Sequence, residues 1–251
     1  MPAVSPWRTS PPVEVWHDTT EAWRSDPDRS TRGLAWLTES ERVRYTRFVH
    51  DDDRWMFLVG RVMARALVGR ALGCAPTGWR WREGPHGRPE IDEPGVTWRF
   101  NVAHSAGLVV CALADGHDVG VDVENLERRD MSPGFARRYL SPTEVEDVHS
   151  QPAGERQERL LTYWTLKEAY LKARGLGVSV PLSDIEFTLA TPGPRISFLG
   201  TLAGTATDWH FHLTRPTARH LMAVASQGTS RVSAGHTFSA PETQSSGIVF
   251  P

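Results

Sequence analysis

Two segments of this 251-residue chain begin a helix in the same way, roughly one hundred residues apart. Thr38-Glu39-Ser40-Glu41 and Ser141-Pro142-Thr143-Glu144 each place a hydroxyl at the helix cap and a carboxylate three residues later, which is the capping-box pattern. A similar order of helical and strand-like segments surrounds each copy. The repeat predicts an α+β fold of two similar halves, residues 1–115 and 116–227, with a small-molecule site between them.

Hydrophobic periodicity predicts the individual elements of the two halves. Helices are expected from Thr38 to about Phe48, from Asp51 to Gly73 and from about Glu155 to Ala173. Strands are expected at Val13–His17, Trp79–Arg82, Val96–His104, Leu108–Ala114, Val119–Glu124, Ile185–Leu189, Arg195–Leu199, Trp209–Leu213 and Leu221–Ala225. Glycine-containing turns join the third, fourth and fifth of these strands, which predicts an antiparallel meander. Residues 228–251 are rich in Ser, Thr, Gly and Pro, and we expect a mostly disordered tail there.

Composition excludes several classes of protein. The longest apolar run, Leu108–Ala114, is much shorter than the roughly 20 residues of a membrane helix, so we expect no membrane span. A formal net charge of −2 disfavours a broad nucleic-acid surface. The N-terminal residues lack the pattern of a secretion signal. Cys74 and Cys111 lie far apart without metal-ligand spacing, so a disulfide framework is not expected and a reducing cytoplasm is the predicted compartment.

Lysine is rare in this chain. Among 28 basic residues only Lys167 and Lys172 are lysines, and they lie five positions apart. A compact, flexible ammonium differs from a guanidinium fork, so the pair points to a site that needs point charges. The alternative is that two lysines fall near each other by chance.

Two carboxylates alternate along one predicted strand, Gly120-Val121-Asp122-Val123-Glu124. Residues two apart on a strand face the same side, so Asp122 and Glu124 share one face. Two carboxylates held close repel each other unless a cation lies between them, and oxygen ligands suit magnesium or calcium. The alternative is the solvated polar face of an amphipathic strand.

Other charged and polar residues stand at positions suited to a phosphorylated ligand. On the predicted helix, Glu168 and Lys172 are four residues apart and share a face; the alternative is a surface ion pair. His104 and Ser105 end a strand beside a glycine-containing turn and can hydrogen-bond a phosphate, although the backbone can equally satisfy a turn histidine. A Ser–His hydrolase is disfavoured, because adjacent strand residues point in opposite directions. Arg88, between Gly87 and Pro89, offers a planar cation or is simply a solvated loop residue.

Together and in this order, these motifs resemble the 4′-phosphopantetheinyl transferase superfamily, in its larger two-halved, surfactin-synthetase-activating type. The matching segments are Gly87-Arg88-Pro89, Phe100–Ser105, Gly120–Glu124 and Trp164–Lys172, with Arg47–His50 and Gly60-Arg61 similar to the family's N-terminal helices. The resemblance covers about residues 13–226. Its specific part is the combination of Asp-x-Glu with Trp-x-x-Lys-Glu-x-x-x-Lys.

The resemblance implies a fold, a reaction and a partner. The fold would be two α+β halves in a pseudo-twofold arrangement, with the active site in the cleft between them. The enzyme would transfer the phosphopantetheine arm of coenzyme A to a serine of an apo acyl or peptidyl carrier protein, releasing adenosine 3′,5′-bisphosphate. The carrier domains would belong to fatty-acid, polyketide or nonribosomal peptide synthases, in secondary metabolism such as siderophore or polyketide biosynthesis. The enzyme would be a cytoplasmic monomer that needs magnesium or manganese.

The resemblance also implies roles for individual residues. The metal ligands would be Asp122, Glu124 and Glu168; the catalytic residues would be Glu168, as general base, and Lys172. Coenzyme A would be held by Arg44, Arg88, His104, Ser105, Lys167 and Lys172. Glu41 stands where the family often has a second cation for the 3′-phosphate, and Arg54 or Arg47 would then compensate. Residues 125–139 would lie near the carrier-docking surface.

Two other functions stay open from the sequence. A degenerate homologue would bind coenzyme A or carrier proteins without catalysis. An unrelated magnesium-dependent phosphodiesterase or nucleotidyl transferase would act on nucleotides without a carrier protein.

Overall fold

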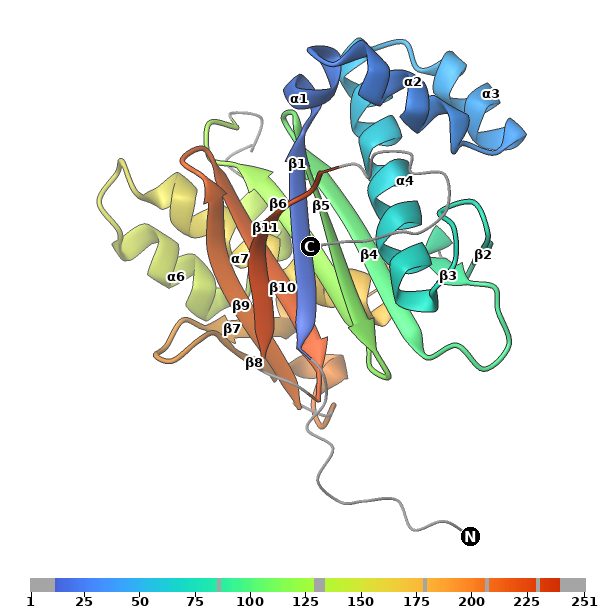
Figure 1. Ribbon diagram of the computed structural model, residues 1–251. Coiled ribbons are helices and arrows are strands. Elements are labelled where there is room, and N and C mark those ends of the chain that lie inside the picture. Colours follow the sequence, from blue (N-terminus) through green and yellow to red (C-terminus); the bar gives the residue numbers. More distant parts are fainter. Residues whose placement is uncertain are drawn as a thin grey trace, which may run out of the picture.

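The computed structural model describes residues 12–84, 87–128, 134–177, 180–205, 208–228 and 231–239. The helices are α1 (Thr20–Arg24), α2 (Pro27–Ala35), α3 (Glu39–Arg47), α4 (Asp51–Leu72), α5 (Phe135–Tyr139), α6 (Pro142–Ser150) and α7 (Arg156–Arg174). The strands are β1 (Val13–Thr19), β2 (Trp81–Glu83), β3 (Pro89–Ile91), β4 (Trp98–Ser105), β5 (Leu108–Asp115), β6 (Val119–Asn125), β7 (Ile185–Thr188), β8 (Arg195–Phe198), β9 (Trp209–Thr217), β10 (His220–Gln227) and β11 (Val232–Thr237) (Figure 1).

Local signals in the sequence mark the ends of the helices correctly. Both predicted capping boxes form, with Thr38 starting α3 and Ser141 starting α6. Gly73 ends α4 at a φ of 67° and Gly175 ends α7 at a φ of 62°, left-handed conformations that glycine adopts without a steric penalty. The three predicted helices therefore correspond to α3, α4 and α7. Of the helices in the described ranges, none combines the length and apolarity that crossing a bilayer requires.

Two main sheets divide the strands, and the predicted meander is wrong at its third strand. β4 and β5 form the expected antiparallel hairpin, but the four-stranded sheet runs β11-β1-β5-β4 and the three-stranded sheet runs β6-β10-β9. β6 cannot pair with β5, because β1 and β4 already occupy both edges of β5. The turn after β5 therefore carries the chain into the second sheet, where β6 pairs with β10.

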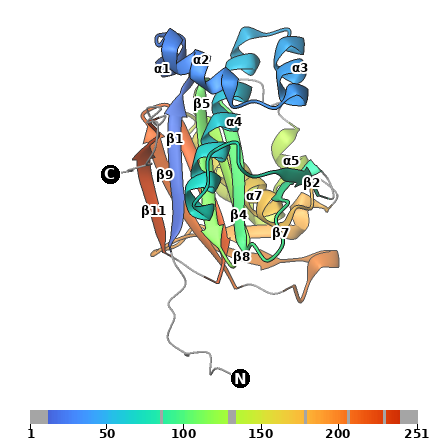
Figure 2. The same cartoon turned by 45° about the vertical axis from the view of Figure 1, so that its right-hand side comes forward.

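The two sheets pack against each other and each carries a long helix on its outer face. Apolar residues from both sheets fill the space between them, among them Val15, Val110, Val121 and Val224. α4 covers the outer face of the four-stranded sheet and α7 that of the three-stranded sheet (Figures 1 and 2). Each half therefore buries a helix–sheet core of its own, and the inner sheet faces make a third core that holds the halves together.

The edges of β4 and β6 meet without a backbone ladder. The side chain of Asn101 on β4 accepts a hydrogen bond from the backbone N–H of Val121, at 2.9 Å. The hydroxyl of Ser105 accepts one from the backbone N–H of Asn125, at 3.1 Å. Side chains of the first half thus satisfy backbone groups of the second, and this contact lies beside the predicted site.

The C-terminal segment corrects the prediction of a disordered tail. β11 pairs in parallel with β1, and Phe238 just after it is 4% exposed within the core under α4. His236 stacks on Trp16 of β1, with ring centroids 4.6 Å apart. The sequence pattern missed this strand because its residues, Val-Ser-Ala-Gly-His-Thr, are mostly small or polar, and an edge strand needs few apolar residues. Residues 240–251 lie outside the described residues.

Candidate active site

A glycine sets how closely α7 approaches β6. A Cβ added at Gly120 would lie 2.2 Å from the carbonyl oxygen of Ala169 and 2.3 Å from the backbone nitrogen of Ala173. No other residue fits there without moving the helix. This close contact places the face of α7 that carries Glu168 and Lys172 alongside the carboxylates of β6.

The two β6 carboxylates are buried, and basic side chains neutralise them. Asp122 is 5% exposed, and its Oδ1 accepts a hydrogen bond from the Lys172 ammonium at 2.5 Å. Its Oδ2 is buried and has no hydrogen-bond partner among the described residues. Glu124 is 8% exposed, and its Oε1 accepts hydrogen bonds from Arg128, at 2.8 Å, and from the indole N–H of Trp164, at 2.9 Å. Alternation along the strand thus points both acids toward α7, as predicted.

Glu168 completes a group of three neighbouring carboxylates. Burial raises the pKa of each, and the charge of Asp122 raises the pKa values of Glu124 and Glu168 further. The Lys172 ammonium opposes these increases at Asp122 and Glu168. Within the described ranges, no three acidic, histidine or cysteine side chains stand close enough together to form a metal-ligand set. The acids are therefore electrostatic neighbours, and in this structure Lys172 and Arg128 occupy oxygens that a cation would need.

A pocket of about 240 Å³ lies next to this group, between the two halves. Its walls include Arg88 and Asn101 from the first half and Glu168, Lys172 and Gly175 from the second. No described residue makes a hydrogen bond or ion pair with the Glu168 carboxylate. The pocket therefore offers one free carboxylate and one ammonium on the same wall.

Arg88 lines this pocket and also links the two halves. Its guanidinium donates to the carbonyl oxygen of Ala173 in the last turn of α7, and its Nη2 lies 3.5 Å from Asp118. That Nη2 is buried and makes no hydrogen bond to a described residue. The arginine is therefore partly engaged in structure, through Ala173 and the nearby Asp118 carboxylate, and a ligand would have to reach its buried Nη2.

His104 and Ser105 stand at the end of β4 near the same charges. Partial desolvation lowers the pKa of His104, and the charge of Lys172 lowers it further. Asp53 and Asp122 act in the opposite direction, so His104 lies between the start of α4 and the carboxylate group. The Ser105 hydroxyl accepts the N–H of Asn125, and its proton is still free to be donated to a phosphate oxygen of a ligand.

Lys167 does not belong to this group, which corrects the prediction that it holds a phosphate. Its side chain is fully buried, and its ammonium pairs with the Glu144 carboxylate at 2.6 Å. It also donates to the carbonyl oxygens of Tyr139, Leu182 and Ile185, at 2.6–2.9 Å. These acceptors use its whole donor capacity, so no phosphate can reach it.

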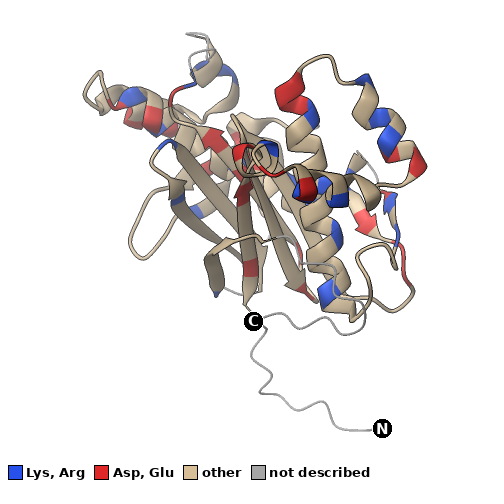
Figure 3. Ribbon diagram, turned by 45° about the horizontal axis from the view of Figure 1, so that its top comes forward, with Lys and Arg blue, Asp and Glu red and all other residues tan. Residues whose placement is uncertain are grey.

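Arg44 lies in a different cluster, on α3 and α4. Its guanidinium stands over the ring of Phe57 at 5.3 Å, next to Arg61. Glu41 offsets one of the three positive charges of this cluster, because it pairs with Arg65 at 2.8 Å and with Arg61 at 3.7 Å. Basic and acidic segments also lie near one another on other helices (Figure 3). None of these residues lines the pocket beside Glu168.

Sequence reasoning missed three contributors to the site. Arg128 and Trp164 hold Glu124, and Asn101 binds β6 and lines the pocket. The signal for Trp164 was present in the helix motif, because it precedes Glu168 by one turn. Arg128 and Asn101 carried no local signal, since their partners come from packing.

Comparison with known proteins gives consistent matches over both halves. The model of the 4′-phosphopantetheinyl transferase superfamily matches residues 118–225, and the model of the 4′-phosphopantetheinyl transferase N-terminal region matches residues 21–115. The 4′-phosphopantetheinyl transferase HetI of Nostoc sp. is 32% identical over 197 residues, covering 75% of this chain and 82% of the relative. The 4′-phosphopantetheinyl transferase Sfp of Bacillus subtilis is 28% identical over 167 residues, covering 66% of this chain and 72% of the relative.

Solved structures of smaller proteins match part of the chain. The holo-[acyl-carrier-protein] synthase of Thermotoga maritima aligns with 43% of this chain and 61% of its own, at 26% identity and a TM-score of 0.35. That of Bacillus anthracis, solved in complex with CoA (3′,5′-ADP), covers 43% of this chain and 93% of its own, at 24% identity and a TM-score of 0.36. The sequence matches decide the classification: the chain belongs to the 4′-phosphopantetheinyl transferase superfamily.

Proposed function

We propose that this protein transfers the 4′-phosphopantetheine arm of coenzyme A to a serine of an apo carrier protein, leaving adenosine 3′,5′-bisphosphate. Family membership supports the reaction. One observation carries its location: Glu168 and Lys172 share the wall of a pocket between the halves, and the buried Asp122 adjoins them. A serine hydroxyl attacks the phosphorus that bears pantetheine, and the bond to the other phosphate breaks.

The donor set of the site suits a magnesium ion. Three carboxylates provide oxygen ligands, and no residue in the described part of the chain donates a hydrogen bond to the buried Oδ2 of Asp122, which is costly unless a cation or donor arrives. Asp122, Glu124 and Glu168 would hold the ion, after Lys172 and Arg128 release the oxygens they occupy. Magnesium would supply charge stabilisation for the diphosphate, and manganese has the same ligand preference.

Basic and polar residues of both halves would hold the diphosphate and the nucleotide. Lys172 is 30% exposed, so its ammonium can turn from Asp122 to a phosphate oxygen. Arg88 offers a buried donor without a hydrogen bond, and His104 and Ser105 offer donors at the end of β4. Arg44 would have to act from its separate cluster, at the end of the ligand remote from the reacting phosphorus. In a site with little water, such fixed charges stabilise the developing charge on the leaving group.

Glu168 is the best placed group to take the proton of the attacking serine. Its carboxylate lines the pocket, is free of hydrogen bonds to described residues, and lies beside a buried aspartate. Lys172, four residues later on the same face of α7, would neutralise the departing phosphate. Glu168 would thus act on the attacking serine, and Lys172 on the leaving phosphate.

The partner would be an acyl or peptidyl carrier domain of a fatty-acid, polyketide or nonribosomal peptide synthase. One chain supplies both walls of the pocket, which is consistent with a monomeric enzyme. Cys74 and Cys111 are both free thiols, which suits the reducing cytoplasm.

The test is a mass-spectrometric assay of apo carrier proteins incubated with coenzyme A and magnesium, with and without a chelator. We expect the carrier to gain the phosphopantetheine mass only with metal. Asp122→Ala and Glu168→Ala should abolish the gain while circular dichroism shows an intact fold. Coenzyme A binding without turnover, or full activity in either variant, would refute the proposal.

A further inference from the structure

The turn between β4 and β5, which follows the proposed ligands His104 and Ser105, has an unfavourable backbone. It contains only Ala106 and Gly107, with φ angles of 42° and 84°. Ala106 is the one non-glycine residue with a positive φ in the described ranges. A two-residue hairpin of this kind needs positive φ at both positions, which alanine resists. The surrounding structure must therefore hold the turn in place.

Three hydrogen bonds hold it, and two come from the other half of the molecule. The backbone N–H of Thr20 donates to the carbonyl of Gly107, at 2.8 Å. The backbone N–H of Asn125 donates to the hydroxyl of Ser105. The imidazole Nε2 of His220 lies 3.0 Å from the carbonyl oxygen of Ser105. Since His220 stands opposite Asn125 in the β10–β6 ladder, both inter-half bonds arise at one point of the second sheet.

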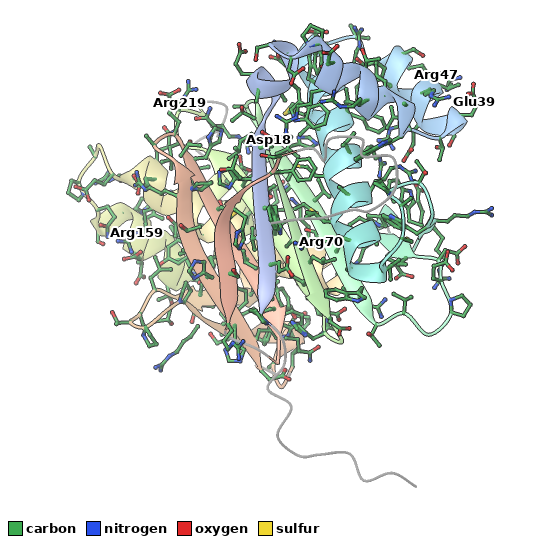
Figure 4. The ribbon with its side chains drawn as sticks, viewed as in Figure 1. Asp18, Glu39, Arg47, Arg70, Arg159 and Arg219 are labelled. Atoms are coloured by element: carbon green, nitrogen blue, oxygen red, sulfur yellow. The ribbon has the colours of Figure 1, made fainter. Side chains whose placement is uncertain are left out.

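A chain of hydrogen bonds fixes His220 in one tautomer. The Ser105 carbonyl can only accept, so Nε2 carries the proton and Nδ1 must accept from the Thr217 hydroxyl, 2.8 Å away. The Thr217 oxygen in turn accepts the backbone N–H of Arg219, at 3.2 Å. His220 is 3% exposed, and burial lowers its pKa, in line with a neutral ring. Figure 4 locates this chain by Arg219, which is labelled at the β9–β10 turn.

The same strands carry the proposed reaction groups. Asp122 and Glu124 precede Asn125 on β6, and His104 precedes Ser105 on β4. The contact of His220 with Ser105 therefore acts together with the Asn125–Ser105 and Val121–Asn101 hydrogen bonds on the spacing between the carboxylates of one half and the β4–β5 turn of the other. The sequence pattern of β10, which is that of an apolar strand, did not predict this role of His220.

We propose that His220 is a positioning residue. Its hydrogen bond to Ser105 holds the β4–β5 turn, so that His104 and Ser105 contact coenzyme A at a fixed distance from the carboxylates of β6. This inference rests on the proposed function, because it assumes that coenzyme A contacts this turn. In this role His220 acts through the backbone carbonyl of Ser105 rather than through a contact with the substrate.

The test compares four variants by steady-state transfer and by calorimetric binding of coenzyme A. His220→Leu removes the donor, whereas His220→Gln keeps an N–H near the position of Nε2. Thr217→Val removes the hydroxyl that fixes the tautomer at little change in shape. His210→Leu, at an exposed histidine of the neighbouring strand β9, is the matched control.

We expect His220→Leu to raise the KM and Kd for coenzyme A by up to about tenfold, the limit reached when the whole free energy of one well-made hydrogen bond has to be supplied as coenzyme A re-orders the released turn. The KM for the carrier should stay unchanged and kcat should change less than threefold. His220→Gln should recover most of the affinity for coenzyme A. Thr217→Val should weaken the affinity by a smaller factor than His220→Leu does. His210→Leu should bind coenzyme A as the wild type does.

A merely structural role would give a different pattern. It would lower the folded fraction, and with it the apparent kcat, while the KM for coenzyme A stayed constant. If His220→Leu does not fold, the comparison of Thr217→Val with the wild type decides. Wild-type affinity for coenzyme A in the folded variants would overturn the positioning role of His220 and leave the proposed function standing. A wild-type protein that neither binds coenzyme A nor modifies a carrier would overturn both.

Discussion

Replacing Lys167 by methionine separates a structural lysine from a phosphate-binding one. The ammonium is fully buried and pairs with Glu144, which is also fully buried as a side chain. Lys167→Met leaves that carboxylate without its countercharge and removes one donor from each of three carbonyl oxygens. Breaking a buried pair by removing one partner costs about 3–5 kcal/mol. At about 2–4 °C per kcal/mol for a chain of this size, Tm should fall by roughly 6–20 °C.

The Glu144 side chain makes a second variant informative. Its two oxygens also accept the backbone N–H groups of Ser141 and Phe187, both at 2.8 Å, so Glu144→Gln keeps an acceptor for one of them and turns its NH2 toward the other. The double variant Lys167→Met with Glu144→Gln removes the uncompensated charge. We expect the double variant to recover part of the stability lost in Lys167→Met. The difference between its change in unfolding free energy and the sum of the two single changes measures the coupling of the pair.

The assay is urea and thermal unfolding followed by circular dichroism, together with calorimetric binding of coenzyme A. Lys172→Met is the matched control, because this lysine lies on the same helix and is 30% exposed. It should lose most transfer activity with a smaller fall in Tm. A Lys167→Met protein with wild-type stability and weakened coenzyme A binding would refute the structural assignment.

Three further predictions follow from packing, charge and the C-terminal strand. Gly120→Ala should lower the free energy of unfolding by about 1–3 kcal/mol, because its Cβ would lie 2.2 Å from the carbonyl oxygen of Ala169. Gly134→Ala is the control, because its Cβ would meet nothing within 4 Å. Equal Tm values for the two variants would contradict the close approach of α7 to β6. Glu168→Gln should stabilise the metal-free protein at neutral pH, since burial raises the pKa of the carboxyl and penalises its charged form above that pKa. The gain in urea unfolding should disappear below the ordinary value of 4.5, and a gain that persists there would exclude this cause. Deleting residues 229–251 should lower Tm relative to a chain ending after residue 239, because it removes β11 and exposes the edge of β1. Equal Tm values for the two chains would favour the original prediction of a mostly disordered tail.

Local pattern predicted which side chains share a face. Asp122 and Glu124 point the same way because strand residues alternate, and Glu168 and Lys172 do so because a helix turns every 3.6 residues. Capping boxes and terminal glycines likewise act within a few residues of backbone. These features depend on neighbours in sequence, so they could be read before any tertiary contact was known.

Long-range packing decided what each face meets. Lys167 is adjacent to Glu168 in sequence, yet about 100° of helix rotation turns it toward Glu144 and away from the pocket. β6 joins β10 because β1 and β4 occupy both edges of β5, and Arg88 is partly used at the end of α7.

The sequence by itself therefore determined the helices α3, α4 and α7 and the start of α6, most strands, the family and the acidic and basic residues that face one another across β6 and α7, whereas α1, α2 and α5 were not predicted. Only the tertiary structure decided which lysine is buried, which edges pair, and that the last strand belongs to the first sheet. The physical reason is that backbone periodicity is local, whereas burial and charge pairing depend on segments brought together from up to two hundred residues away, as when Phe238 joins the core beneath α4.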